Sequence, residues 1–222
     1  MWLSAQLPEA ARQWFSDALT LAKGAAVASP ALSARWSACG RRLGRAPAEL
    51  GEAAAAALRG QGVPFIPTGW GHDELGRVLL LLAAAQSTPA SELPAAIEEL
   101  FRTGEMREQH AVLKALAYLP APDRFAAIAA EAVRNNVLSV LEALVCDNPF
   151  PAAHLPEPAF NQMIMKAIFN GLPLRRVLGL SGRLAPELRR MVSAYASERR
   201  AAGRPVPADV DFVLGGAEHA SL

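Results

Sequence analysis

The sequence predicts an all-α fold without a significant sheet, and three observations carry this prediction. Strand signals are nearly absent, because no Asn-Gly pair stands between two strand-like segments as in a hairpin and no sustained alternation of apolar and polar residues occurs. Apolar residues instead recur at helical spacing in many segments. Prolines also stand repeatedly where such a segment begins, as is typical of helix starts. We therefore expect a bundle of about ten short helices.

Three apolar stripes at helical spacing identify the clearest helices. They comprise Leu93, Ile97, Leu100 and Phe101, then Phe125, Ile128, Ala129, Ala132 and Val133, and finally Leu188, Met191, Val192 and Tyr195. The prolines expected at helix starts are Pro8, Pro30, Pro47, Pro89, Pro122, Pro158 and Pro186. Proline suits the first helical turn because the amide hydrogen that it lacks would have no partner there.

The spacing of the middle helices predicts stacked helix pairs. Helices expected to begin near Asp73, Glu105 and Asn136 are separated by about 31 residues, a period typical of α-solenoids. We expect a right-handed stack of antiparallel helix pairs, either a HEAT-like α-solenoid or a bundle. The predicted parts are an Ala-rich helical region ending in an irregular linker (1–69), a helical-repeat domain (70–204) and an extended tail (205–222).

Composition and charge exclude several classes of protein. Of the 222 residues, 52% are hydrophobic and 19% are charged, with a formal net charge of +1. These values exclude a disordered polymer and a collagen, and a nearly neutral chain has no overall field that selects nucleic acid or an anionic membrane. Cys39 and Cys146 have no paired spacing, and neither a signal peptide nor a membrane-spanning run is evident. A soluble, cytoplasmic protein is expected.

The helix predicted over residues 158–170 carries the first candidate site. Its apolar residues cover most of its circumference, which indicates a buried helix. Asn161, Gln162 and Lys166 share one of its faces, and buried amides and a buried ammonium group are costly unless they are paired. The face is therefore either a structural network or a ligand site. In the preceding turn, Asp147 and Asn148 either stop a helix or border this site, with Asp147 as the charge partner of Lys166.

Three arginines and one tyrosine complete the candidate ligand-binding residues. Arg134 stands at a helix junction from which it could reach the same cavity. Residues 175–204 contain eight arginines and two glutamates, so an anionic group could meet Arg183 or Arg199 there. Tyr195 precedes Arg199 by one helical turn and could line the pocket with it. The alternative for this segment is a solvated basic face that pairs with acidic residues of the same fold.

Motifs of metal and cofactor sites are absent from the sequence. The chain has no Cys/His cluster, no Gly-rich phosphate loop and no dinucleotide-binding fingerprint. His72-Asp73-Glu74 is expected to form a helix start with acidic residues in the first turn, as the helix dipole favours. His110 borders a core stripe and is expected to be a satisfied core histidine. No metal and no cofactor are expected.

Several ungapped motifs in the second half of the chain resemble a known family. They are Asp147-Asn148-Pro149-Phe150-Pro151, Ala159-Phe160-Asn161-Gln162-Met163 with Lys166-Ala167-Ile168-Phe169, Val177-Leu178-Gly179-Leu180, Glu187-Leu188-Arg189-Arg190-Met191 and the segment 198–207. These motifs are similar to the EboA-domain family over residues 105–207, whereas the first hundred residues carry no diagnostic motif. The resemblance implies a component of an ebo-type gene cluster that makes or exports a secondary metabolite. It supplies no catalytic residue.

Two functions from different classes follow from the resemblance and the candidate residues. The first is a non-catalytic accessory protein that binds a small apolar or prenylated pathway intermediate, a partner enzyme or another ebo-cluster protein. The second is an enzyme of the same pathway that uses Lys166 and Asp147 for acid/base chemistry. A weaker third hypothesis is a helical repeat that binds nucleic acid. The near-neutral charge disfavours it, and no nucleic-acid partner is expected.

Overall fold

The computed structural model describes residues 2–60, 63 and 69–215 of the chain. Within these ranges the chain forms thirteen α-helices, four short 3-10 helices and no strand, with one isolated β-bridge between Pro47 and Gly71. The prediction of an all-α fold is confirmed. Among the described helices, none combines the length and the hydrophobicity needed to cross a lipid bilayer. The chain divides into two compact units, residues 1–128 and residues 129–222.

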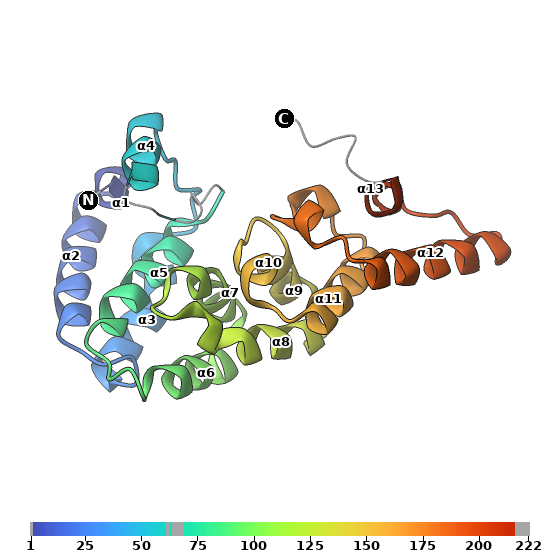
Figure 1. The fold of residues 1–222 in the computed structure, drawn as a ribbon. Helices are drawn as coiled ribbons and strands as arrows, with labels where there is room; N and C mark the ends of the chain where they lie inside the picture. Colours follow the sequence, from blue (N-terminus) through green and yellow to red (C-terminus); the bar gives the residue numbers. More distant parts are fainter. Residues whose placement is uncertain (1, 61–62, 64–68, 216–222) are drawn as a thin grey trace. The chain divides into compact units, whose positions relative to one another are not determined.

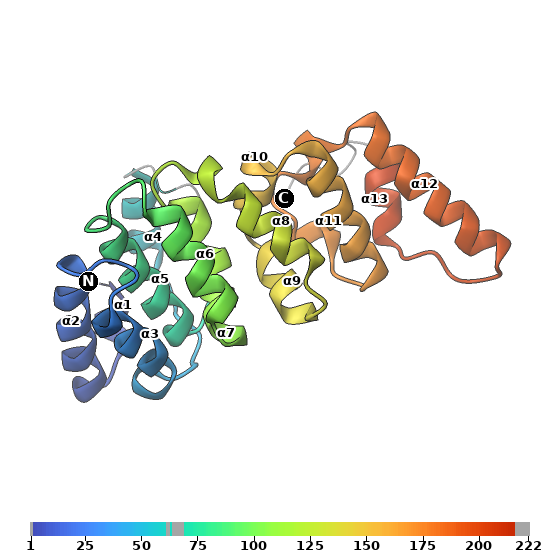
Figure 2. The ribbon, with the colours of Figure 1, turned by 90° about the horizontal axis from the view of Figure 1, so that it is seen from below.

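The first unit is built around one central helix. Its elements are α1 (Trp2–Gln6), α2 (Glu9–Lys23), α3 (Pro30–Leu43), α4 (Glu52–Gly60), α5 (His72–Ala85), α6 (Leu93–Thr103), α7 (Met106–Ala115), η1 (Leu116–Tyr118) and η2 (Pro122–Phe125). Helix α5 packs against α2, α3 and α7 (Figures 1 and 2). Gly76 permits the close approach of α3, because a Cβ atom there would meet the Cδ1 atom of Leu43 at 2.2 Å.

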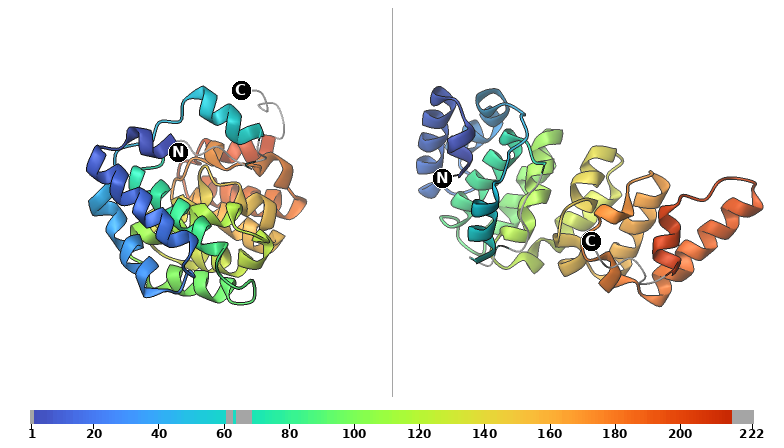
Figure 3. Two further views of the ribbon diagram at one scale, coloured as in Figure 1. Left: turned by 90° about the vertical axis from the view of Figure 1, so that its left-hand side faces the viewer. Right: turned by 90° about the horizontal axis from the view of Figure 1, so that it is seen from above.

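The second unit is centred on α11. Helix α8 (Ala126–Arg134) runs across the division and is followed by α9 (Leu138–Val145), α10 (Phe150–His154), α11 (Glu157–Phe169), η3 (Leu174–Arg176), η4 (Leu180–Arg183), α12 (Pro186–Ala201) and α13 (Asp209–Gly215). Helix α11 contacts α9 and α12, and α12 packs on α13 (Figure 3). As expected for a helix that is apolar on most of its circumference, the core stripe of α11 is buried; it comprises Phe160, Met163, Ile164, Ala167 and Ile168. Phe169, expected to extend this apolar surface, is instead 61% exposed at the end of the helix.

Most predicted helix starts are confirmed. The helices expected near Asp73, Glu105 and Asn136 begin at His72, Met106 and Leu138. Pro30, Pro122, Pro158 and Pro186 stand in the first turns of α3, η2, α11 and α12. The helix start predicted at Pro89 lies four residues before α6, which begins at Leu93. The helix start predicted at Pro47 is wrong. The backbone beside it is held extended, because the amide of Ala48 donates to the carbonyl of Trp70 at 2.8 Å and the amide of His72 donates to the carbonyl of Ala46 at 2.9 Å.

The extended tail predicted after residue 204 is wrong for residues 209–215, which form α13. Two interactions favour this helix. Val210 and Val213 are fully buried, and Arg189 Nη1 donates to the carbonyl oxygen of Val213 at 2.7 Å. Residues 216–222 and most of the linker predicted before residue 70 lie outside the described residues. The domain boundary predicted at residues 69 and 70 falls within the first unit and, like the HEAT-like stacking, stays a prediction.

Candidate functional site

Lys166 is bound by the end of another helix. Its Nζ atom donates to the carbonyl oxygens of Val133 and Asn135, at 2.7 and 2.6 Å. These carbonyls lie at the last turn of α8 and just beyond it, where the backbone has no partner within the helix and where a cation also meets the negative end of the helix dipole. These contacts are those expected if Lys166 belongs to a structural network and not to a ligand site.

The expected pairing of Asp147 with Lys166 is not found, because Asp147 pairs with Arg176. The Nε and Nη2 atoms of Arg176 donate to Asp147 Oδ2 at 2.8 and 2.6 Å, and Arg176 Nη1 donates to Glu142 at 2.9 Å. The Asp147 amide also donates to the carbonyl of Arg176 at 2.8 Å. Asp147 adopts a left-handed backbone conformation with φ of 52°. These hydrogen bonds connect the end of α9 to η3.

The amide side chains differ in their surroundings. Asn148 is buried and bridges α9 and α10, since its Nδ2 donates to the carbonyl of Ala143 at 3.1 Å and its Oδ1 accepts from the amide of Phe150 at 3.0 Å. Asn161 is 3% exposed, and its buried Oδ1 has no hydrogen-bond partner among the described residues. Gln162 is exposed on the surface of α11. Asn161 and Gln162 therefore do not share one environment.

Arg183, Tyr195 and Arg199 make separate contacts. Arg183 donates to the carbonyls of Ala152 and Leu155 at 2.5 and 2.8 Å and lies 4.5 Å above the centre of the Phe160 ring. Tyr195 meets Phe169 edge to face, with ring centres 5.0 Å apart. Arg199 Nε donates to the carbonyl of Pro205 at 2.7 Å, and its guanidinium lies 5.8 Å from the Tyr195 ring.

Arg134, the last candidate of this set, is exposed at the end of α8. The structure thus places all nine predicted ligand-binding residues in the second unit. Five of them have side-chain hydrogen-bond partners within the fold, namely Asp147, Asn148, Lys166, Arg183 and Arg199. Their role in ligand binding stays a prediction.

The first unit also contains a buried network of charged residues that was not predicted from the sequence. There, Asp73 and Glu74 were interpreted only as acidic residues at a helix start. Asp73 is fully buried and accepts hydrogen bonds from Arg77 Nη1 at 3.0 Å and from Arg107 Nε and Nη2 at 2.7 and 2.6 Å. Because Arg107 belongs to α7, the carboxylate joins two helices. One signal was present in the sequence: α5 is apolar on nearly every side after Arg77, so its first turn is buried too.

Glu74 forms the second half of this network. Its carboxylate accepts from the Gly71 amide at 3.1 Å and lies 3.0 Å from Lys114 Nζ and 3.6 Å from His110 Nδ1. Burial would raise the pKa of Glu74, but His110, Lys114 and the Gly71 amide together lower it to about 2. Asp73 is affected in the same way: burial opposes the charge, and the two arginines lower its pKa. Both carboxylates are therefore ionised at neutral pH.

We expect the stability of the first unit to fall when the pH falls. A carboxyl group whose pKa is lower in the folded state stabilises the fold above its unfolded pKa, and this contribution is lost as the pH drops toward the folded value. For Glu74 the window runs from about 4.5 down to about 2. Urea midpoints measured across this window test the prediction. The Glu74→Gln variant should show a shallower pH dependence than the wild type, and equal slopes would contradict it.

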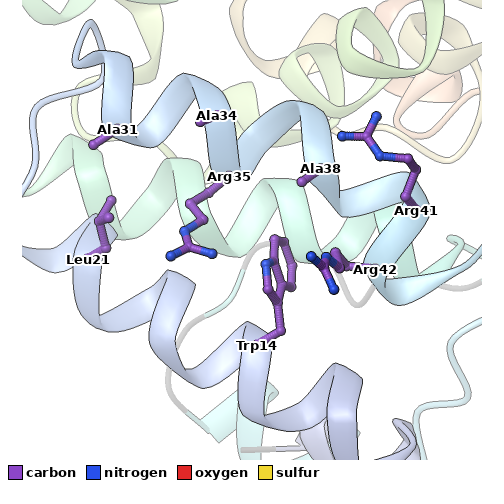
Figure 4. A pocket seen from close by; sticks show the side chains of 8 residues that line it. All are labelled: Trp14, Leu21, Ala31, Ala34, Arg35, Ala38, Arg41 and Arg42. Atoms are coloured by element: carbon purple, nitrogen blue, oxygen red, sulfur yellow. The ribbon is translucent and has the colours of Figure 1, made fainter.

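An open groove in the first unit lies between α2 and α3 and encloses about 610 Å³. Figure 4 shows Trp14 of α2 facing the side of α3 that carries Arg35, Ala38 and Arg42. The full lining is Trp14, Leu21, Ala31, Ala34, Arg35, Ala38, Arg41 and Arg42. The groove exists because α3 has small residues on this face, while Leu32, Trp36 and Cys39 on its other face are buried in the core.

The groove is positively charged. Within residues 2–60, 63 and 69–215, the guanidinium groups of Arg35, Arg41 and Arg42 form no hydrogen bond and no ion pair. Arg35 lies 5.9 Å from the centre of the Trp14 ring, in a cation–π contact. Asp17, one turn after Trp14 on α2, accepts a hydrogen bond from Gln13 at 3.0 Å. No carboxylate lines the groove.

The described part of the chain has no group of three or more His, Cys, Asp or Glu side chains arranged to hold a metal ion. Cys39 and Cys146 are buried free thiols, and burial raises the pKa of Cys39 to about 12. Burial raises the pKa of Cys146 as well, so it disfavours the nucleophilic thiolate form of both residues.

The fold and the groove define an all-helical protein with a cationic, small-molecule-sized depression. The chain belongs to the EboA family: the family model described as "Metabolite traffic protein EboA" matches residues 1–214. The match therefore includes the first hundred residues, in which the sequence showed no diagnostic motif. No curated protein and no solved structure matches the chain. The family description agrees with an accessory role in metabolite handling.

Proposed function

We propose that this protein is a non-catalytic accessory component of metabolite handling and that it binds a pathway metabolite in the groove between α2 and α3. The observation that carries the proposal is the groove itself. Its volume of about 610 Å³ lies in the range of small-molecule sites, roughly 300–1,000 Å³. It combines an aromatic ring, an apolar wall of alanines and a few polar groups, which is the usual composition of such sites.

The residues of the groove support binding rather than catalysis. They comprise arginines, alanines, one tryptophan and one leucine, and include no carboxylate, imidazole, thiol, hydroxyl or amine. Arginine stays protonated in proteins, so none of these groups exchanges a proton near neutral pH. The enzyme hypothesis has less support, because Lys166 is held by two carbonyls and Asp147 by Arg176. The predicted prenylated intermediate and ebo-cluster partners remain candidates for what the protein handles.

Filling the groove tests this proposal. Ala38 is half-buried at the middle of the α3 face, so Ala38→Phe places a ring where the metabolite would lie. We expect native mass spectrometry of the full chain, purified from its own host, to detect a noncovalent adduct that is lost on denaturation. The variant should reduce its occupancy at least tenfold.

Ser33→Phe is the matched control, because Ser33 is exposed on α3 and does not line the groove. It adds the same ring to the same helix and should leave the adduct unchanged. Circular dichroism should show both variants folded. An adduct that Ala38→Phe retains, or a wild-type protein without any adduct, would contradict the proposal.

A further inference from the structure

We propose that the α2–α3 groove selects an anionic metabolite with a flat aromatic body; this rests on the proposed function and specifies its ligand. Arg35 and Arg42 supply the charge, and Trp14 supplies the surface for the ring (Figure 4). A guanidinium group donates two parallel hydrogen bonds to carboxylate, sulfonate or phosphate oxygens. An indole ring offers a large apolar face that stacks on other rings.

Helix α3 supplies all the positive charge of the groove. The helix carries Arg35, Arg41 and Arg42 and no acidic residue. Arg41 and Arg42 stand in its last turn, where the helix dipole favours cations. The dipole does not account for Arg35, which lies in the middle of the helix and is half-buried beside Trp14. Arg35 is therefore the residue whose position points to a ligand.

The hydrogen-bond partners of the half-buried arginines support the same inference. Elsewhere in the described chain, arginines that are half-buried find acceptors: Arg107 bonds Asp73, Arg183 bonds two carbonyls and Arg189 bonds the carbonyl of Val213. Arg35 differs because its guanidinium has only the Trp14 ring. An anion bound in the groove would supply the hydrogen-bond acceptors that the Arg35 guanidinium lacks within the described part of the fold.

The shape of the groove favours a flat body. Trp14 and Leu21 of α2 line one side of the groove, and Ala31, Ala34 and Ala38 of α3, whose methyl groups leave room beside the helix, line the other (Figure 4). A planar ring between these walls would contact apolar surface on both faces, and its anionic substituent would face the arginines. Leu21 lies near Ala31, away from Trp14 and Arg42 (Figure 4).

Two matched dyes test this inference. 8-Anilinonaphthalene-1-sulfonate carries a sulfonate, and N-phenyl-1-naphthylamine has the same rings without the charge. We expect the full-length protein to bind the sulfonate dye at least tenfold more tightly than the neutral dye, measured by fluorescence titration. The double variant Arg35→Gln and Arg42→Gln should weaken sulfonate binding at least tenfold and change binding of the neutral dye less than threefold.

The control removes the same charge elsewhere. Arg175→Gln with Arg200→Gln deletes two exposed arginines that do not line the groove, so it corrects for the net charge of the protein. This variant should keep the affinity of the wild type for both dyes. Equal weakening by the two double variants would overturn the inference, as would equal affinity of the wild type for both dyes. Equal urea midpoints show that each variant is folded.

A competition experiment separates the possible sources of the anion. Phenyl phosphate and benzoate should displace the sulfonate dye, whereas vesicles of phosphatidylglycerol should not. Displacement by the vesicles alone would assign the groove to a lipid surface and overturn the inference. If native mass spectrometry detects a metabolite that Ala38→Phe excludes, but that metabolite is neutral, the proposed function stands and the anionic selectivity fails. If no adduct forms, the proposed function fails.

Discussion

Replacing Asp73 with asparagine is expected to lower the free energy of unfolding of the first unit by about 3–5 kcal/mol. The carboxylate is fully buried and balances two arginines, Arg77 and Arg107. An amide of the same shape removes the negative charge and leaves the buried Arg77 and the half-buried Arg107 without their main carboxylate partner. Urea denaturation followed by tryptophan fluorescence measures the effect, because all four tryptophans precede residue 128.

The control for Asp73→Asn is the same chemical change at an exposed pair. Glu52 lies 3.0 Å from Arg59, and its side chain is 82% exposed. Exposed ion pairs contribute about 0.2–1 kcal/mol, so Glu52→Gln should have an effect several times smaller. If both variants unfold at the same urea concentration, the buried network does not stabilise the first unit as we infer.

Replacing Lys166 with methionine is expected to lower the free energy of unfolding of the second unit by about 2–4 kcal/mol. The ammonium group donates to the carbonyls of Val133 and Asn135, and hydrogen bonds to charged groups contribute about 1.5–3 kcal/mol each. Methionine keeps an unbranched chain as far as the ε position and leaves both carbonyls without this donor. Far-UV circular dichroism during urea denaturation measures the loss, since α8 and α11 depend on the contact.

Lys166→Met also separates a structural lysine from one kept for a ligand. Lys23 is exposed in the last turn of α2, so Lys23→Met removes the same charge at a site without such contacts and should change stability by less than about 0.5 kcal/mol. A Lys166→Met protein as stable as the wild type would contradict the structural role. That result would favour the alternative hypothesis, in which Asn161, Gln162 and Lys166 form a ligand-binding face.

Helix positions could be predicted because their signals are local. The stripe of Phe160, Met163 and Ile164 repeats every three to four residues, and all three side chains are fully buried. Pro186, the first residue of α12, marks its start for an equally local reason. The prediction failed at Pro47 and at residues 209–215. Backbone pairing with Trp70 decides the first case, and packing of Val210 and Val213 decides the second.

The candidate site was less predictable because it depends on contacts between distant residues. The sequence places Asp73 in a first helical turn, a position that is usually solvated, and Arg107 is 34 residues away. Likewise, Trp14 and Arg35 stand on different helices, and no spacing within either helix indicates that they border one groove. The arginines of α3 also resemble ordinary surface charges, since residues 175–204 contain far more.

For this protein, the sequence by itself determined the helical class, most helix starts, the core stripe of α11 and the resemblance that the family match confirms. Tertiary structure alone decided which charges meet. Asp147 pairs with Arg176 rather than Lys166, and Asp73 is buried while Arg35 faces an open groove. The physical reason is the distance along the chain over which each property is determined. Apolar periodicity is set by neighbours within a few residues, whereas burial and partnering of a charge are set by the helices that pack around it.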